Sequence, residues 1–208
     1  MKKNNTLNLS CLIAILVLLL SACSTTQKVT HSARTATEQL LISEAVARSL
    51  PKQIDLPFPI PRGAVVQLDV TGLTADKDMA KGVIAGWLGM LGYTTQDGPE
   101  NATHRINIVL DSLGTEAGGT FFGIPPVQAS LIPISLPELA FFKAEYQSGY
   151  ARFHLDVFEM PSGRFVGSSS PFIADTFYNG YTVLFLFNFN RTDLTSPPQI
   201  GTFRKPLM

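Results

Sequence analysis

Cys23 is the residue whose neighbours suggest the most defined chemistry in this chain. It closes the run Leu-Ser-Ala-Cys at residues 20–23, after a basic start at residues 1–3 and an apolar stretch at residues 7–20. A basic segment, a short apolar segment and small residues before a cleavage point are typical of a removable secretion signal. The apolar stretch is shorter than the roughly 20 residues that a membrane-spanning helix needs. We therefore predict a lipoprotein signal peptide over residues 1–22, with residues 20–23 as its lipobox.

In this interpretation Cys23 becomes the first residue of the mature chain. Its sulfur receives a diacylglycerol and its amine an acyl chain such as palmitate, so the protein meets the membrane through its N-terminal lipid. Ser24 follows the cysteine. An aspartate at this position would favour retention in the inner membrane of many Gram-negative bacteria. The serine therefore favours lipid anchoring in the cell outer membrane, with the domain on its periplasmic or its outer face. The alternative is a cleaved secretory signal that contains this run by chance. Cys11 lies in the leader, so the mature chain has no second cysteine for a disulfide.

Composition excludes several classes of partner. The chain has 16 basic and 16 acidic residues, and two of the lysines are lost with the leader. A nearly neutral, slightly acidic chain lacks the basic patch of a nucleic-acid binder, so we expect no nucleic acid among its partners. Only 15% of residues are charged and 14 are phenylalanine, so some apolar surface is expected to meet a membrane, an envelope protein or a second copy.

The first half of the mature chain alternates helix and strand patterns. Residues 23–33 are polar and aperiodic, which predicts the lipidated cysteine and a flexible tether. Thr35 and Glu38 form a capping-box pattern for a helix that ends at Pro51. An alternating strand is expected over residues 64–70, a second helix over 76–91 with Met79, Val83, Trp87 and Met90 on its core stripe, and another strand near 106–110.

The second half predicts consecutive strands. The expected strands cover residues 151–157, 164–170 and 181–189, with a hairpin turn at 161–163 and all five odd-numbered residues of the last strand on one face. Together the patterns predict a single α+β domain over residues 34–193. Its sheet would be mixed, mostly antiparallel and of about five strands, with helices packed mainly on one face. Residues 194–208 are expected to form an irregular tail.

One set of residues could support catalysis. His154 and Asp156 share a strand face, and the hairpin was expected to place Ser169 opposite His154, which gives the residue types of a serine hydrolase triad. The run at residues 167–171 lacks the G-x-S-x-G turn that exposes such a nucleophile. Alternating polar residues on a strand more commonly form its solvated face. We therefore expect no catalytic residues.

Cofactor and metal sites have little support. The three histidines, His31, His104 and His154, stand far apart in sequence without a second ligand at helix or turn spacing. No glycine-rich phosphate loop is present. We therefore expect neither a cofactor nor a metal.

An uncharged segment supplies the candidate interface. Between Glu116 and Glu138 no residue is charged, and prolines at 125, 126, 133 and 137 oppose regular helix or central strand. Residues 117–142 are therefore expected to form an extended apolar surface segment that docks on a partner, a second copy or the membrane, with a loop folded over the sheet as the alternative. Its candidate contact residues are Phe121, Phe122, Ile124, Leu131 and Ile132.

Several patches resemble an uncharacterised family of bacterial lipoproteins known as a domain of unknown function. They are residues 34–41, 114–115, 122–125 and 137–138, with Gln147 and Gly149. The resemblance implies a lipoprotein and transfers no catalytic residues. The expected function is thus a non-catalytic, lipid-anchored cell-envelope lipoprotein with a binding or scaffolding role. The alternatives are a small envelope hydrolase and a carrier of an apolar ligand.

Overall fold

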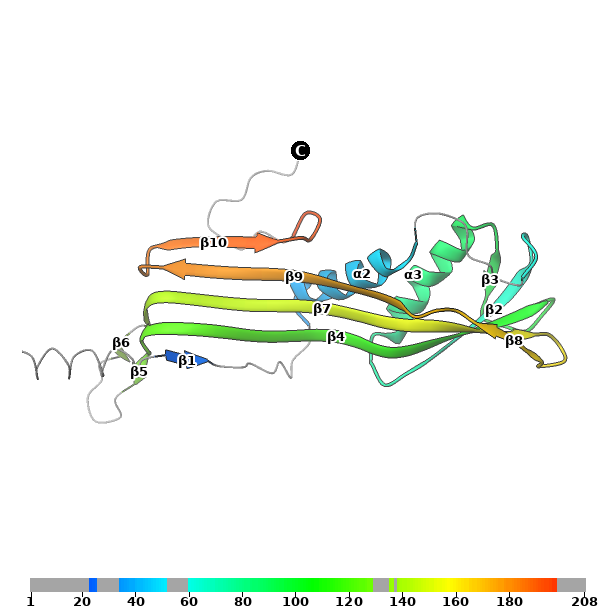
Figure 1. The fold of residues 1–208 in the computed structure, drawn as a ribbon, viewed down its shortest axis with the longest axis horizontal. Helices are drawn as coiled ribbons and strands as arrows, with labels where there is room; N and C mark the ends of the chain where they lie inside the picture. Colours follow the sequence, from blue (N-terminus) through cyan, green and yellow to red (C-terminus); the bar gives the residue numbers. More distant parts are fainter. Residues whose placement is uncertain (1–22, 26–33, 52–59, 129–134, 137, 198–208) are drawn as a thin grey trace, which may run out of the picture. The chain divides into compact units, whose positions relative to one another are not determined.

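The fold is a mixed α/β arrangement with a mostly antiparallel sheet (Figure 1). The computed structural model describes residues 23–25, 34–51, 60–128, 135–136 and 138–197. Its helices are α2 (Ala36–Ser49) and α3 (Lys77–Met90). The strands are β1 (Cys23–Thr25), β2 (Val65–Gly72), β3 (Thr94–Gln96), β4 (His104–Ile124), β5 (Val127–Gln128), β6 (Ser135–Leu136), β7 (Leu139–Glu159), β8 (Phe165–Ser168), β9 (Phe172–Val183) and β10 (Phe187–Thr192).

The main sheet has more strands than the sequence predicts. Among the described residues it contains eight strands in the order β10-β9-β7-β4-β2-β3, with β1 paired to β4 and β8 paired to β7. The expected number was about five. β5 and β6 form a separate pair. β2 runs parallel to both β3 and β4, and this accounts for the mixed character of the sheet.

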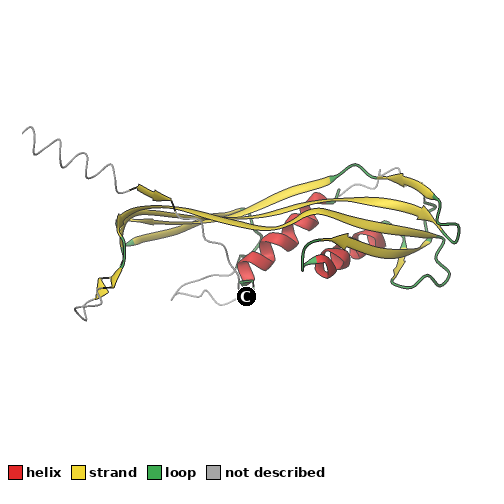
Figure 2. Ribbon diagram, turned by 90° about the horizontal axis from the view of Figure 1, so that it is seen from below, coloured by secondary structure: helices red, strands yellow, loops and turns green. Residues whose placement is uncertain are grey.

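The chain forms two compact units that are both discontinuous in sequence. Unit 1 comprises residues 1–29, 117–146 and 179–191, and unit 2 comprises residues 30–116, 147–178 and 192–208. β4, β7 and β9 therefore each contribute residues to both units. Within the described residues, both helices belong to unit 2. Figure 2 draws the helices in red and the strands in yellow.

Helix α2 confirms the capping-box prediction. The Glu38 backbone N–H donates to Thr35 Oγ1 at 3.2 Å, and the Thr35 backbone N–H donates to Glu38 Oε2 at 2.7 Å. These bonds satisfy two of the donors that a helix start leaves unpaired. The helix ends at Ser49, just before Pro51, as predicted.

Helix α3 confirms the predicted position and the predicted stripe except at Met90. The buried residues are Ala80, Ile84, Trp87 and Leu88, whereas Met90 is 77% exposed. Of the expected stripe, Trp87 is buried in the core and Met79 and Val83 are half-buried against it, so only Met90 lies outside. At the start of the helix, Thr74 Oγ1 accepts a bond from the Asp76 N–H.

Unit 2 has one hydrophobic core that both helices share with β2, β4 and β7. Its fully buried residues include Val46, Leu68, Ile84, Ile108 and Phe153. The alternation predicted for 64–70, 106–110 and 151–157 is confirmed, since alternate residues of these strands are buried, with Val70 half-buried against the core. The Phe153 ring stacks on Phe172 with centroids 5.2 Å apart.

Two predictions for the later strands are wrong. Residues 181–189 do not form one strand, because β9 ends at Val183 and β10 begins at Phe187. Residues 117–142 do not lack secondary structure, because β4 continues to Ile124 and β7 begins at Leu139. None of the four prolines lies within β4 or β7, so they do not interrupt either strand.

The segments at the two ends of the predicted domain also differ from expectation. Cys23–Thr25 form β1 rather than the start of a tether, while residues 26–33 lie outside the described residues. Leu194, the first residue of the expected tail, is 7% exposed and belongs to the packed part of unit 2. Residues 198–208 lie outside the described part of the chain.

Candidate functional site

Cys23 lies next to two of the residues proposed as an interface. In unit 1, β1 pairs antiparallel with β4, placing Cys23 opposite Phe122 and Ser24 opposite Phe121. The sequence predicts a lipidation site at Cys23 and an apolar segment around Phe121 as separate features, because almost 100 residues separate them. The pairing brings both to one end of β4.

The five predicted interface residues have different surroundings. Phe121 and Phe122 are half-buried, and the Phe122 ring lies 6.1 Å from that of Phe141 on β7. Ile124 is 46% exposed. Leu131 and Ile132 lie outside the described residues, so their part in the predicted interface stays a prediction.

The turn between β9 and β10 adds residues that the sequence analysis missed. Leu184 and Phe185 have φ of 48° and 49°, and the Leu186 N–H donates to Val183 O at 3.4 Å. Two positive φ angles at the centre of a four-residue turn correspond to a type I′ hairpin, where Asn-Gly is the usual sequence. Leucine and phenylalanine therefore occupy backbone positions that disfavour them.

This turn is attached to the beginning of β7. The Leu184 N–H donates to Phe141 O at 2.9 Å, and the Phe185 N–H donates to Ala140 O at 2.8 Å. Phe141 in turn contacts Phe122, which is paired with Cys23. The turn, the start of β7, the end of β4 and β1 thus form one end of unit 1.

We call this end of unit 1 the apolar end. It is defined by exposed large apolar side chains that no other described part of unit 1 covers. Their exposed fractions range from 38% for Leu139 to 69% for Leu186. The members are Ile124, Leu139, Phe141, Leu184, Phe185, Leu186 and Phe187.

The sheet of unit 1 has two different faces. Tyr181 contacts both Tyr146, with centroids 6.3 Å apart, and Phe189, with centroids 5.1 Å apart. Because alternate residues of a strand point to opposite faces, these contacts identify one apolar face. It carries Phe142, Tyr146, Tyr181, Val183, Phe187 and Phe189.

The opposite face carries Lys143 and Glu145, while Arg191 at the end of β10 lies in phase with Phe189 on the apolar face. Lys143 and Glu145 alternate with the apolar residues of β7, and Lys143 Nζ lies 3.1 Å from Glu138 and 3.2 Å from Glu145. Burial opposes the charge of Lys143, but its hydrogen bonds to Glu138 and Glu145 outweigh this effect and raise the pKa of the ammonium. Two other segments of the chain, residues 117–137 and 176–190, contain no charged residue.

The residue types of the hydrolase alternative are only partly brought together. In unit 2, His154 Nδ1 lies 3.4 Å from Asp111, and Nε2 lies 3.8 Å from Asp156. Arg152 also reaches Asp111 at 3.4 Å. His154 is thus flanked by two carboxylates in a surface cluster of mixed charge.

Ser169 does not lie opposite His154, contrary to expectation. β7 and β8 pair Asp156 with Ser168, and Ser169 exchanges bonds with Leu155 through its N–H at 2.9 Å and its Oγ at 3.0 Å. Leu155 is fully buried, so Ser169 lies on the core-facing side and His154 on the other. Phe158 pairs with Phe165 in the assumed register, but a register shift between Val157 and Phe158 changes the pairing by one residue and moves the serine to the other face.

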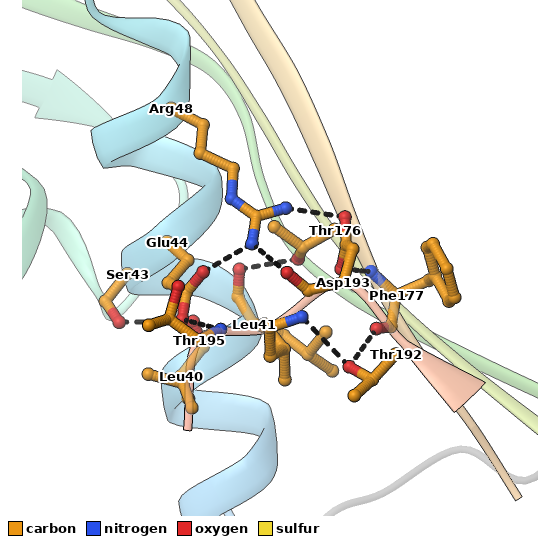
Figure 3. Close-up of polar contacts among 11 residues, drawn as sticks. Leu40, Leu41, Ser43, Glu44, Arg48, Thr176, Phe177, Thr192, Asp193 and Thr195 are labelled. Carbon is orange, nitrogen blue, oxygen red and sulfur yellow. Dashed lines mark hydrogen bonds and ion pairs between the residues drawn. The ribbon is translucent and has the colours of Figure 1, made fainter. Parts of the chain in front are cut away.

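A second polar cluster, in unit 2, joins helix α2 to residues 193–195. Figure 3 shows Arg48 of α2 bonded to Glu44 and to both the side chain and the backbone O of Asp193. Burial opposes the charge of Arg48, but its hydrogen bonds to Glu44 and Asp193 outweigh this effect and raise the pKa of the guanidinium. The Thr195 N–H donates to Glu44 and the Phe177 N–H donates to Asp193, each at 2.8 Å. The cluster holds residues 193–195 on α2 and has a structural role.

An apolar hollow of about 350 Å³ lies between α2 and α3. Leu50, Pro51, Val83, Trp87 and Met90 are among the residues that line it. Pro51 borders residues 52–59, which lie outside the described chain.

Metal-ligand geometry, helix hydropathy and similarity to known proteins assign no further chemistry to the described residues. Within the described residues, no group of histidine, cysteine or carboxylate side chains is arranged to bind a metal ion. No helix in the described part of the chain has the length and hydropathy to cross a membrane. Neither protein-family models nor curated proteins give a match to this chain.

Proposed function

We propose that the protein is a non-catalytic, lipid-anchored lipoprotein of the cell envelope, held in the outer membrane, with a binding or scaffolding role. The observation that carries the proposal is the leader that ends in Leu-Ser-Ala-Cys at residues 20–23. Acylation supplies about 0.8 kcal/mol per buried CH₂, so several chains on Cys23 hold a protein on a membrane stably.

The placement of Cys23 supports this proposal. β1 begins at Cys23 and pairs with β4 next to half-buried Phe121 and Phe122. An acylated residue at this position brings the apolar end of unit 1 to the bilayer surface. Unit 2 supplies a helix-covered core, and our prediction that its helices lie mainly on one face remains part of the proposal.

Mass spectrometry of the N-terminal peptide tests the proposal. The protein is extracted from envelope membranes with detergent and digested. We expect an N-terminal peptide that begins at Cys23 and carries the mass of a diacylglycerol and an acyl chain. The peptide is expected in the outer-membrane fraction. A peptide that begins at unmodified Cys23, or one that retains residues 1–22, would contradict the proposal.

A further inference from the structure

We propose that the apolar end of unit 1 and its adjoining apolar face enter the lipid bilayer that holds the acylated Cys23. The inference deepens the proposed function, on whose lipid anchor it rests, by assigning the binding partner of this surface as the membrane lipid itself. Three separate observations support it.

The first observation is where the anchor begins. β1 places Cys23 opposite Phe122 on β4, and Phe122 contacts Phe141 at the start of β7. The β9–β10 turn donates backbone bonds to Phe141 and Ala140. The acyl chains therefore leave the protein from the end that also carries the exposed leucines and phenylalanines, and a bilayer that contains the acyl chains meets this end.

The second observation is the residue choice at the turn. Leu184 and Phe185 occupy left-handed positions that asparagine and glycine fill at lower cost. Both side chains are 51% exposed, and Leu186 beside them is 69% exposed. Within the protein, the strained turn exposes two large apolar side chains. An apolar environment outside the protein gives these side chains a favourable location.

The third observation is the distribution of charge. The face that carries Phe142, Tyr146, Tyr181 and Phe189 has one charged residue by alternation, Arg191, at the end of β10 away from the β9–β10 turn, while Lys143 and Glu145 lie on the opposite face. A partner protein would commonly match some charged groups at the rim of its interface. An aromatic surface with exposed turn leucines fits the hydrocarbon and interfacial layers of a membrane better.

Vesicle flotation of unacylated protein tests the inference. The mature chain is made without residues 1–22 and with Cys23→Ser, so that no lipid contributes to binding. Vesicles consist of phosphatidylethanolamine with a minor fraction of phosphatidylglycerol. We expect this protein to float with the vesicles. The double variant L184N/F185G should lose about 100-fold in vesicle partitioning, because each large apolar residue withdrawn from lipid costs about tenfold or more.

The same double variant is expected to unfold at an unchanged or higher denaturant concentration, since Asn-Gly fits the type I′ turn. Loss of binding without loss of stability separates a lipid contact from a structural role. The matched control is L73S/M90S, which removes exposed apolar side chains of unit 2 and should float like the parent.

A second measurement does not depend on the folding of the double variant. Cys23→Ser leaves the mature chain without cysteine, so L186C can carry a single polarity-sensitive fluorophore. We expect its emission to shift to the blue when vesicles are added, and the same label at L73C to stay unchanged.

The outcomes separate this inference from the proposed function. Protein that does not float, or an L186C label that does not respond, overturns the inference even if Cys23 is acylated in cells. A dimer in solution that L184N/F185G abolishes, without any flotation of the parent, would assign the surface to a second copy instead. Flotation together with an unmodified Cys23 would uphold the membrane contact and contradict only the lipid anchor.

Discussion

Replacing Gly149 with alanine tests the packing of α2 on the sheet in unit 2. Gly149 lies on β7, and an added Cβ would be 2.6 Å from both the carbonyl carbon and the oxygen of Leu41, and 2.8 Å from Thr176 Oγ1. Ordinary contacts at such a position are 3.4–4 Å. The obstructing atoms are mostly helix backbone, which cannot move aside as a flexible side chain can.

Two costs follow from this clash. Displacing α2 from a packed core costs about 1–3 kcal/mol. The buried Thr176 hydroxyl donates to Leu41 O at 2.8 Å, and stretching this bond adds about 1–2 kcal/mol for a buried polar group left without its partner. We therefore expect Gly149→Ala to lower the free energy of unfolding by about 2–5 kcal/mol.

Urea unfolding of the unacylated mature chain measures this difference. A loss of this size corresponds to a fall in Tm of about 5–15 °C for a chain of this length. Gly167→Ala is the matched control, because an added Cβ at Gly167 meets nothing within 4 Å; it should change stability by less than about 0.5 kcal/mol. Equal stabilities of the Gly149 and Gly167 variants would refute the close approach of α2 to β7.

Two further predictions concern the helix start and the histidine cluster. Thr35→Ala removes the hydroxyl that caps α2 and should lower the free energy of unfolding in urea by about 1 kcal/mol. Thr74→Ala, which affects a looser turn before α3, is the comparison variant. An unchanged urea midpoint for Thr35→Ala would contradict the capping box. His154→Ala should leave stability unchanged within about 0.5 kcal/mol, because the side chain lies on the surface. The same variant should not alter any turnover of ester or amide substrates, and activity that it abolishes would establish the hydrolase alternative.

Local signals in the sequence predicted most of unit 2. The reciprocal bonds of Thr35 and Glu38 follow from their three-residue spacing, and the alternation of Val66 and Leu68 follows from the pleat of a half-buried strand. The register at Ser169 was not predictable in this way, because it depends on a register shift between Val157 and Phe158 that no local pattern marks. A shift of one residue transfers every side chain to the other face.

The strand bounds of unit 1 were not predictable from the sequence for a different reason. Leu184 and Phe185 form a turn without glycine, asparagine or proline, so the alternation from Tyr181 to Phe189 predicts one strand. The prolines between Ile124 and Glu138 suggested an irregular segment over the whole uncharged stretch. They lie between the strands rather than within them. The contact of Cys23 with β4 is a pairing of residues far apart in sequence, which no local pattern encodes.

Metabolic labelling at Cys23 tests the central claim of this account most directly. Cells that express the full chain, or the same chain with Cys23→Ala, are grown with a clickable palmitate analogue, and the protein is isolated and probed for the label. We predict a labelled wild-type protein and an unlabelled variant, because Cys23 is the acylated residue of the proposed lipobox. An unlabelled wild-type protein, or a Cys23→Ala variant that still carries the label, would contradict the lipid anchor.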